Sequence, residues 1–285
     1  MNALIPGEVH YFESPQIDLV PNLQAADNVQ VKVINKMGSQ GWLRLNHLWP
    51  PFDNVKARQA IQALVDQQDY MLAAVGNPEF FQTCAATFIC GAPLESDVNS
   101  SRIMKKDIDL AKKLLKEAGY NGEKIVLMQP TDIATLNAFS AVTAQLLREA
   151  GVDVDLQAMD WSTLTSRRAE QKDPKEGGWN IFHTSWIGPD LMNPVVNIGV
   201  SGGGKEKAWF GWPTDPQPED MRSAFASATD PAKQKEIAIA IQERANELVT
   251  YVPLGQYFQP IAYDKTKIDG VLETPVPVFW NIGLK

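Results

Sequence analysis

The chain has 285 residues, of which 44% are hydrophobic and 21% are charged. This composition is typical of a globular protein with a sizeable core, and the net charge of −8 argues against broad contact with a nucleic-acid backbone. No apolar run reaches the roughly 18 residues of a transmembrane helix, so membrane insertion is not expected.

The first third of the chain predicts two strands, a helix and a long loop. Residues 29–35 (VQVKVIN) and 42–46 (WLRLN) alternate apolar and polar side chains, as half-buried strands do. The prolines of WPPFDN then exclude a helix, and Asp53 or Asn54 can cap the helix VKARQAIQALVDQ that follows. Residues 71–101 are rich in small and turn-forming residues and predict a loop.

The middle of the chain alternates helices and strands. A helix over 107–118 ends at Gly119, and residues 124–159 predict a strand, a helix and a second strand. Such a βαβ unit crosses over with a right hand. The later elements are a helix over 161–170, a strand over 179–183, helices over 219–227 and 231–248, and strands over 251–257 and 261–263. The pattern predicts an α/β fold with a mixed sheet.

Residues 178–215 contain three tryptophans, Trp186, Trp209 and Trp212, interleaved with Gly, Pro, Asn and Asp. Aromatic side chains on irregular backbone are typical of a pocket wall, but a surface loop held by its own aromatics has the same composition. Asp190 lies at the end of a predicted strand, where α/β sheets place ligands. Its carboxylate can accept hydrogen bonds from a ligand ammonium group or cap its own turn.

Other signs of chemistry are few. His10, His47 and His183 fall in different elements without metal-ligand spacing, so no metal or cofactor is predicted, and a structural role is expected for His183. The segment GVSGGGKE lacks the Ser or Thr that completes a phosphate-binding loop, so a nucleotide site is not expected. Basic pairs such as Arg167 and Arg168 lie in helical patterns and predict solvated faces.

The two cysteines, Cys84 and Cys90, are six residues apart. This spacing matches neither a zinc site nor a CxxC redox motif. A buried thiol pair and a small-loop disulfide are both compatible with the residues alone.

Several segments together resemble one known family. They are LRLNHLWPPFDNVKARQAI, DLAKKLLKEAGY, AQLLREAGVDVDLQAMDWSTL, WIGPDLMNP, YVPLGQYFQPIAY and the closing PVPVFWNI. In combination they are similar to the extracellular solute-binding proteins of family 5, the dipeptide, oligopeptide and nickel type that supplies ABC importers.

The resemblance implies a type II periplasmic-binding-protein-like architecture with two lobes around a cleft. Residues 1–43 would end the first lobe and include a crossover strand, 44–257 would form the second α/β lobe, and 258–285 would return to the first. The chain starts inside the family pattern and no signal peptide is predicted in its first residues, so we expect it to lack an N-terminal part. It further implies a monomeric, non-enzymatic protein outside the cytoplasmic membrane, an ABC permease as partner, and a disulfide between Cys84 and Cys90.

Carried over residue by residue, the resemblance implies that Asp190 binds the ammonium group of a peptide or peptide-like solute. The loop QPTDIATL lacks the arginine that holds the ligand carboxylate in dipeptide-specific relatives. The identity of the ligand therefore stays open. Two alternatives are a hydrolase or transferase that uses Asp190 with His183 under the aromatic loop, and an interaction module. The expected ligand-binding residues are Trp186, Gly188, Asp190, Asn193, Trp209 and Trp212.

Overall fold

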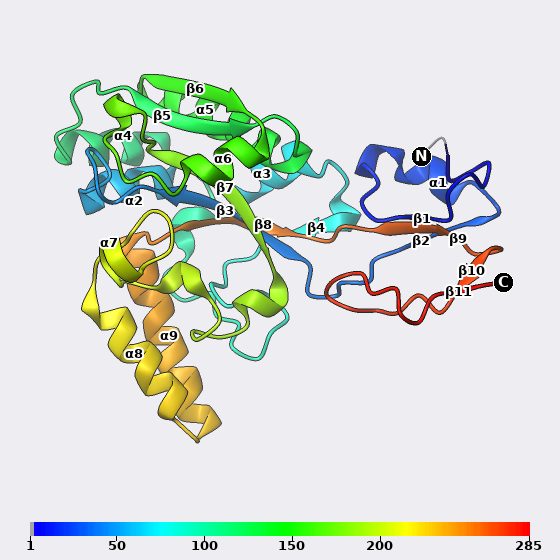
Figure 1. The fold of residues 1–285 in the computed structure, drawn as a ribbon. Helices are drawn as coiled ribbons and strands as arrows, with labels where there is room; N and C mark the ends of the chain where they lie inside the picture. Colours follow the sequence, from blue (N-terminus) through cyan, green and yellow to red (C-terminus); the bar gives the residue numbers. More distant parts are fainter. Residues whose placement is uncertain (1–2) are drawn as a thin grey trace.

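The computed structural model describes residues 3–285 and contains two sheets of different size and a short strand pair (Figure 1). The larger sheet has six strands in the order β4-β8-β3-β7-β5-β6. The pairs β5–β6 and β5–β7 are parallel and the others are antiparallel, so the sheet is mixed, as predicted. In sheet order, the strands are β4 (Phe81–Gln82), β8 (Val252–Tyr257), β3 (Ser39–Leu45), β7 (Ile181–Ile187), β5 (Ile125–Pro130) and β6 (Val154–Met159).

The two faces of the larger sheet have different coverings, because alternate residues of a strand point to opposite sides. On β3, Leu43 lies in the main aliphatic core, whereas Trp42 lies in a separate cluster rich in aromatic side chains. On β5, Leu127 joins the main core and Val126 joins an aromatic cluster. We call the first side the helix face. The second side, which we call the loop face, is covered by residues of loops and short 3₁₀ turns such as Phe88, Leu191 and Val200 and by the helical residues Phe225 and Ile241.

Four helices build the helix face. Helix α5 packs on β5 and β7, α3 packs on α5 and β8, and α4 packs on α2. Asn54 caps α2 by accepting a hydrogen bond from the amide of Lys56, and Asp107 caps α4 through the amide of Leu110. The bounds are α2 (Val55–Ala63), α3 (Gln67–Ala74), α4 (Ile108–Glu117) and α5 (Ala134–Glu149).

The single helix predicted from residue 55 to 67 is wrong at its end, because two helices are present. Asp66 has extended backbone (φ −122°, ψ 109°), and its carboxylate accepts a hydrogen bond from the amide of Gln68. A cap of this kind starts a new helix and interrupts the preceding one. The first residues of the predicted loop therefore belong to α3. The rest holds η2 (Pro78–Phe80), β4 and η3 (Ser101–Ile103).

Short elements and one helical hairpin lie on the other side of the sheet. Helices α8 (Pro216–Ser227) and α9 (Pro231–Leu248) project from the body as an antiparallel pair (Figure 1). The βαβ unit of β5, α5 and β6 is confirmed. Within residues 3–285, no helix combines the length and the apolar composition needed to cross a bilayer. The remaining elements here are α6 (Trp161–Arg167), η4 (Pro174–Glu176), η5 (Gly188–Leu191), η6 (Ile198–Val200) and α7 (Gly204–Lys207).

The two ends of the chain share the smaller sheet, whose order is β1-β9-β2 with antiparallel pairing (Figure 1). Its own apolar cluster contains Leu4, Leu23, Val29 and Ala262 and is separate from the larger core. The segments β2–β3 and β8–β9 connect the two sheets. This region contains β1 (Tyr11–Phe12), η1 (Ile17–Leu19), α1 (Val20–Gln24), β2 (Val29–Lys32), β9 (Ile261–Asp264), β10 (Ile268–Asp269) and β11 (Gly283–Leu284).

Candidate ligand-binding site

The turn after β7 is held tightly against the segment before β3. The amide of Gly188 donates to the carbonyl oxygen of Gly38 at 2.8 Å. A Cβ atom at Gly188 would lie 2.4 Å from the Cβ of Met37, so only glycine fits at this close approach. Gly188 therefore fixes where η5 begins and, through it, where Asp190 is placed.

Asp190 lies in η5 and is partly exposed. Its carboxylate has no hydrogen-bond or ion-pair partner among residues 3–285, and η5 has no side-chain cap. The self-capping alternative is therefore not what the structure shows. An unpaired carboxylate at the end of a sheet strand is available for an external donor.

Asn193 has a structural role, because its side chain holds the backbone of the same loop. Its side-chain oxygen accepts hydrogen bonds from the amides of Val195 at 2.9 Å and Val196 at 3.3 Å. The side-chain amide nitrogen has no acceptor within the described part of the chain. Only this nitrogen is therefore free to contact a solute.

Trp186 and Trp209 form an aromatic wall that packs on the same apolar cluster as Leu191, the last residue of η5. Their ring centroids are 5.5 Å apart, and both rings contact Trp42 at 5.8 and 6.3 Å. Trp42 is fully buried and stacks on Tyr251 at 4.0 Å, so it forms the base of the wall. Trp186 and Trp209 are partly exposed. The indole nitrogen of Trp186 is buried and has no acceptor in residues 3–285.

Trp212 lies one layer deeper than the other two predicted tryptophans. It is only 4% exposed, and its ring centroid is 5.6 Å from that of Trp179. It packs in the cluster that includes Phe182 of β7. Trp212 can therefore support the wall but has little surface to offer to a ligand.

The prediction that Arg167 and Arg168 lie on a solvated face is wrong, because both are partly buried. Arg167 donates to the carbonyl oxygens of Gly177 and Gly178. The Arg168 guanidinium lies among aromatic rings, 5.4 Å from the centroid of Trp209 and 4.9 Å from that of Phe210. Burial lowers the pKa of both arginines. The only signal in the sequence was the nearby aromatic loop, and helical periodicity does not report such a contact.

His183 and Asp190 do not form a catalytic pair. It is fully buried on the helix face, with its ring nitrogens 3.1 Å from Ser140 Oγ and 2.8 Å from Thr143 Oγ1. Burial lowers its pKa to about 3, so the ring is neutral at physiological pH. Trp186, three residues further along the same strand, points to the opposite face. His183 therefore has the structural role expected of it, and the pairing with Asp190 that the enzyme alternative needs is not formed.

The glycine-rich segment GVSGGGKE is folded against α8. The amide of Gly202 donates to Glu219 Oε1 at 2.9 Å, and a Cβ at Gly202 would lie 2.2 Å from the carbonyl oxygen of Asp215. An amide bonded to an internal carboxylate is not available to cradle a phosphate. In the described residues, no group of three or more His, Cys, Asp or Glu side chains is placed to bind a metal.

A hollow of about 350 Å³ adjoins the aromatic wall. It is lined by Ile198, Ser201, Lys207, Ala208, Trp209, Phe210 and Arg222. The wall therefore borders an open space at Trp209.

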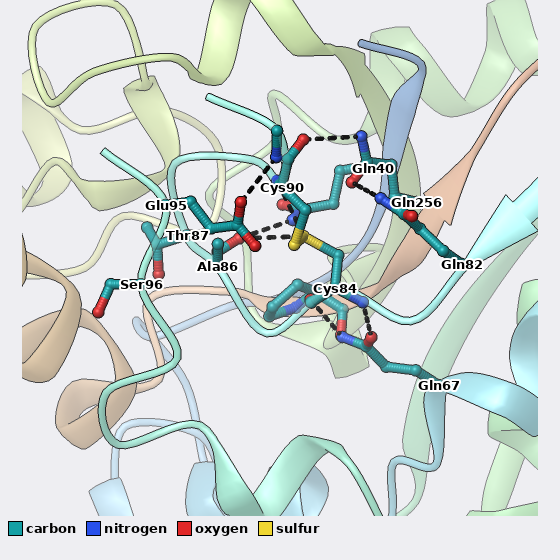
Figure 2. Close-up of a disulfide and its surroundings, with 12 residues drawn as sticks. Gln40, Gln67, Gln82, Cys84, Ala86, Thr87, Cys90, Glu95, Ser96 and Gln256 are labelled. Carbon is teal, nitrogen blue, oxygen red and sulfur yellow. Dashed lines mark hydrogen bonds between the residues drawn. A yellow bond between two sulfur atoms is a disulfide. The ribbon is translucent and has the colours of Figure 1, made fainter. Parts of the chain in front are cut away.

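Cys84 and Cys90 form a disulfide, with their Cα atoms 5.8 Å apart. Glutamine side chains hold this loop, as Figure 2 shows: Gln67 exchanges two hydrogen bonds with the backbone of Cys84, and Gln256 donates to the carbonyl oxygen of Cys90. Residues Ile89 and Leu191 share one apolar cluster. The disulfide loop is thus part of the base on which η5 rests.

The fold is that of type II periplasmic binding proteins. AgaA of A. tumefaciens R10, solved in complex with agropinic acid, matches with a TM-score of 0.83 at 20% identity, over 100% of this chain and 58% of that one. DppA of Helicobacter pylori, in complex with the peptide STSA, matches with a TM-score of 0.80 at 20% identity, over 99% of this chain and 54% of that one.

The sequence comparisons define the family. Residues 1–209 match the family described as bacterial extracellular solute-binding proteins, family 5 Middle. The chain belongs to this family of extracellular or periplasmic solute-binding proteins.

Two curated relatives show how much of a family member the chain covers. It is 38% identical over 281 residues to the probable peptide ABC transporter periplasmic-binding protein y4tO of Sinorhizobium fredii. The aligned region covers 98% of this chain and 52% of that protein. It is 28% identical over 172 residues to the glutathione-binding protein GsiB of Escherichia coli K12, over 59% of this chain and 32% of that protein. The chain thus spans about half the length of the first of these relatives and less of the second.

Proposed function

We propose that the chain is part of the substrate-binding component of an ABC importer and that it captures a peptide or peptide-like solute. The observation that carries the proposal is the unpaired carboxylate of Asp190, four residues after Trp186 of the aromatic wall, in a chain of this family. The name of the 38% identical relative, a probable peptide-binding protein, supports the same substrate class. We expect a monomer outside the cytoplasmic membrane with a permease as partner and no cofactor.

The arrangement of the two sheets supports a two-lobe clamp. We propose that residues 44–257 form one lobe, and that residues 1–43 and 258–285 belong to the other. Residues 33–38 and 258–260 connect the two sheets and are candidates for the hinge. A ligand that contacts both lobes stabilises the closed state by its differential affinity for the two conformations.

Asp190 would accept hydrogen bonds from the α-ammonium group of the solute. Such charge-assisted bonds are stronger than neutral ones because one partner carries a full charge. The indole N–H of Trp186 is buried without an acceptor, and a solute oxygen seated beside the ring would satisfy it. The wall then supplies apolar area, and Asp190 and Trp186 supply orientation.

The end of β5 offers no cation for a solute carboxylate. The amide of Thr131 donates to the carbonyl oxygen of Met159, and Asp132 accepts a hydrogen bond from the amide of Trp161. This favours solutes whose carboxylate is held elsewhere, such as longer peptides and peptide-like compounds.

The test is calorimetric titration of the purified protein with the tetrapeptide Ser-Thr-Ser-Ala and with its N-acetylated form. We expect Asp190→Asn to weaken binding of the free tetrapeptide at least tenfold, the effect of losing one charged hydrogen bond of about 1.5–3 kcal/mol. Because Asp190 has no internal partner, the variant should keep its folding stability. Asp153→Asn removes an exposed acid and is the matched control with unchanged affinity.

Acetylation of the peptide tests the role of Asp190 separately from the proposed binding function of the chain. If Asp190 binds the ammonium group, acetylated peptide should bind wild type and Asp190→Asn equally weakly. Equal binding of the free tetrapeptide to both proteins would remove the role of Asp190. If neither form of the tetrapeptide, nor a solute co-purified with the protein and seen by native mass spectrometry, binds wild type, the proposed function itself fails.

A further inference from the structure

We propose that Arg44 is a positioning residue for the aromatic wall: it holds the backbone that carries Trp209 by donating to carbonyl oxygens of three separate segments. The inference rests on the proposed function, because it assumes that this wall contacts the solute. Arg44 stands in the strand pattern WLRLN, which by itself predicts no role for this side chain.

The contacts of Arg44 converge on the aromatic loop. The side chain leaves β3 on the loop face and is fully buried. Its Nε donates to the carbonyl oxygen of Phe210 at 2.5 Å, and Nη2 donates to that of Trp209 at 3.2 Å. Its Nη1 donates to the carbonyl oxygens of Gly199 at 3.2 Å and Thr250 at 2.7 Å.

Arg44 is a buried cation without a carboxylate partner in residues 3–285. Four carbonyl dipoles surround the guanidinium in place of a counter-ion, and its Cζ lies 5.3 Å from the ring centroid of Trp209. Burial lowers the pKa of Arg44 to about 9, which still leaves it charged at neutral pH. A buried charge is costly unless it is fully hydrogen-bonded. The site therefore requires the loop carbonyls to stay in place.

The loop is shaped to admit this side chain. Gly211 has a φ of +102°, and a Cβ atom there would lie 2.5 Å from the carbonyl oxygen of Leu45 and 2.8 Å from Arg44 Nε. The carbonyl oxygen of Gly211 also accepts a hydrogen bond from the amide of His47 at 2.8 Å. The segment around Gly211 is thus fixed along the end of β3.

Residues 208–215 contain no helix or strand of their own that would orient Trp209. Irregular backbone leaves carbonyl groups that need donors from elsewhere, and Arg44 supplies them to Trp209 and Phe210. The ring of Trp209 in turn contacts that of Trp186 at 5.5 Å. Fixing the carbonyls therefore fixes the wall.

A second buried arginine provides a matched control. Arg58 of α2 is 6% exposed and donates to the carbonyl oxygens of Phe52, Asp53 and Leu248. None of these acceptors belongs to the aromatic loop. Loss of Arg58 should therefore destabilise the fold by the same physical mechanism without loosening the wall.

The experiment compares Arg44→Met, Arg44→Lys and Arg58→Met by amide hydrogen exchange without ligand and by titration with Ser-Thr-Ser-Ala. We expect both Met variants to melt at lower temperature than wild type. Exchange of the amides in residues 198–212 should become at least about tenfold faster in both Arg44 variants only, with about tenfold weaker peptide binding. Lysine should not rescue either property, because one ammonium group cannot replace the planar fork of donors.

Unchanged exchange in residues 198–212 of Arg44→Met, or an equal change in Arg58→Met, would overturn the inference. If Arg44→Met does not fold, Arg44→Lys and Gly211→Ala test the same contact from both sides. Absence of peptide binding by wild type would count against the proposed function, while the exchange measurement would still decide the role of Arg44.

Discussion

The two faces of the six-stranded sheet are covered in physically different ways. On the helix face, aliphatic side chains of β3, β5 and β8 pack against α2, α3 and α5 in one core. On the loop face, aromatic rings sit on irregular backbone beside apolar residues of α8 and α9. That backbone is anchored by buried polar side chains: Arg44, Asn46, Asn197 and Gln242 are each fully or almost fully buried.

The difference follows from where the backbone hydrogen bonds are made. A helix satisfies its own amides and carbonyls, so its packing face can be entirely apolar. A loop cannot, and side chains must supply the missing partners. Asn197, for example, accepts from the amide of Gly199 at 2.9 Å and donates to the carbonyl oxygen of Thr87 at 3.1 Å. The loop face therefore depends on a few specific polar contacts, and the helix face depends on buried area.

The largest effect is expected on the helix face, from Phe139→Ala. Phe139 is fully buried, and its ring fits against Gly41, where a Cβ would lie 2.6 Å away. The cavity should lower the free energy of unfolding by about 3–5 kcal/mol, measured by urea denaturation with an unchanged m value. Amides of residues 198–212 can exchange through local opening of the loop or through global unfolding. If the two faces are independent, the exchange through local opening should not change. Selective loosening of that loop would show that the faces are coupled.

A smaller loss is expected from the paired substitution Cys84→Ser with Cys90→Ser. Removing a cross-link over so short a loop costs about 2 kcal/mol in the chain-entropy model. Because Ile89 shares a cluster with Leu191, exchange in η5 should also become faster. Gln67→Ala is the comparison variant, since it removes the two hydrogen bonds to Cys84 and keeps the disulfide. An unchanged η5 in the Ser variant would exclude the disulfide loop as part of its base.

The third effect, similar in size to that of the disulfide, is a pH dependence from His183, a buried polar side chain on the helix face. Burial lowers its pKa to about 3, whereas a histidine in the unfolded chain titrates near 6.5. Between these values the unfolded state binds one more proton, so this contribution to stability is lost as the pH falls. From pH 7 to pH 5 the loss is about 2 kcal/mol.

The variant His183→Gln isolates the contribution of His183 to the pH dependence of stability. Carboxylates also change stability on acidification, so the quantity to compare is the difference between variant and wild type at pH 7 and at pH 5 in urea denaturation. The variant should lose less stability than wild type over this range. Equal losses would mean that His183 is protonated in the folded protein, contrary to its buried contacts with Ser140 and Thr143.

The helix face follows from the sequence almost element by element. Period-3.6 and period-2 patterns place α5 between β5 and β6, and side-chain caps such as Asn54 and Asp107 mark the helix starts. These signals are local, because apolar spacing and capping act within a few residues of the chain. The one missed boundary, at Asp66, is a cap hidden inside an otherwise continuous helical pattern.

The loop face was fixed only in the tertiary structure. The sequence singled out Trp186, Asp190 and Trp209, but not which rings would be buried. It gave no sign that Arg44 would reach carbonyl groups 155 to 206 residues away in the chain. Contacts between a side chain and distant backbone leave no periodic trace, because they depend on where irregular segments meet in space. The sequence thus determined the sheet and its helices, and the assembled fold determined the wall.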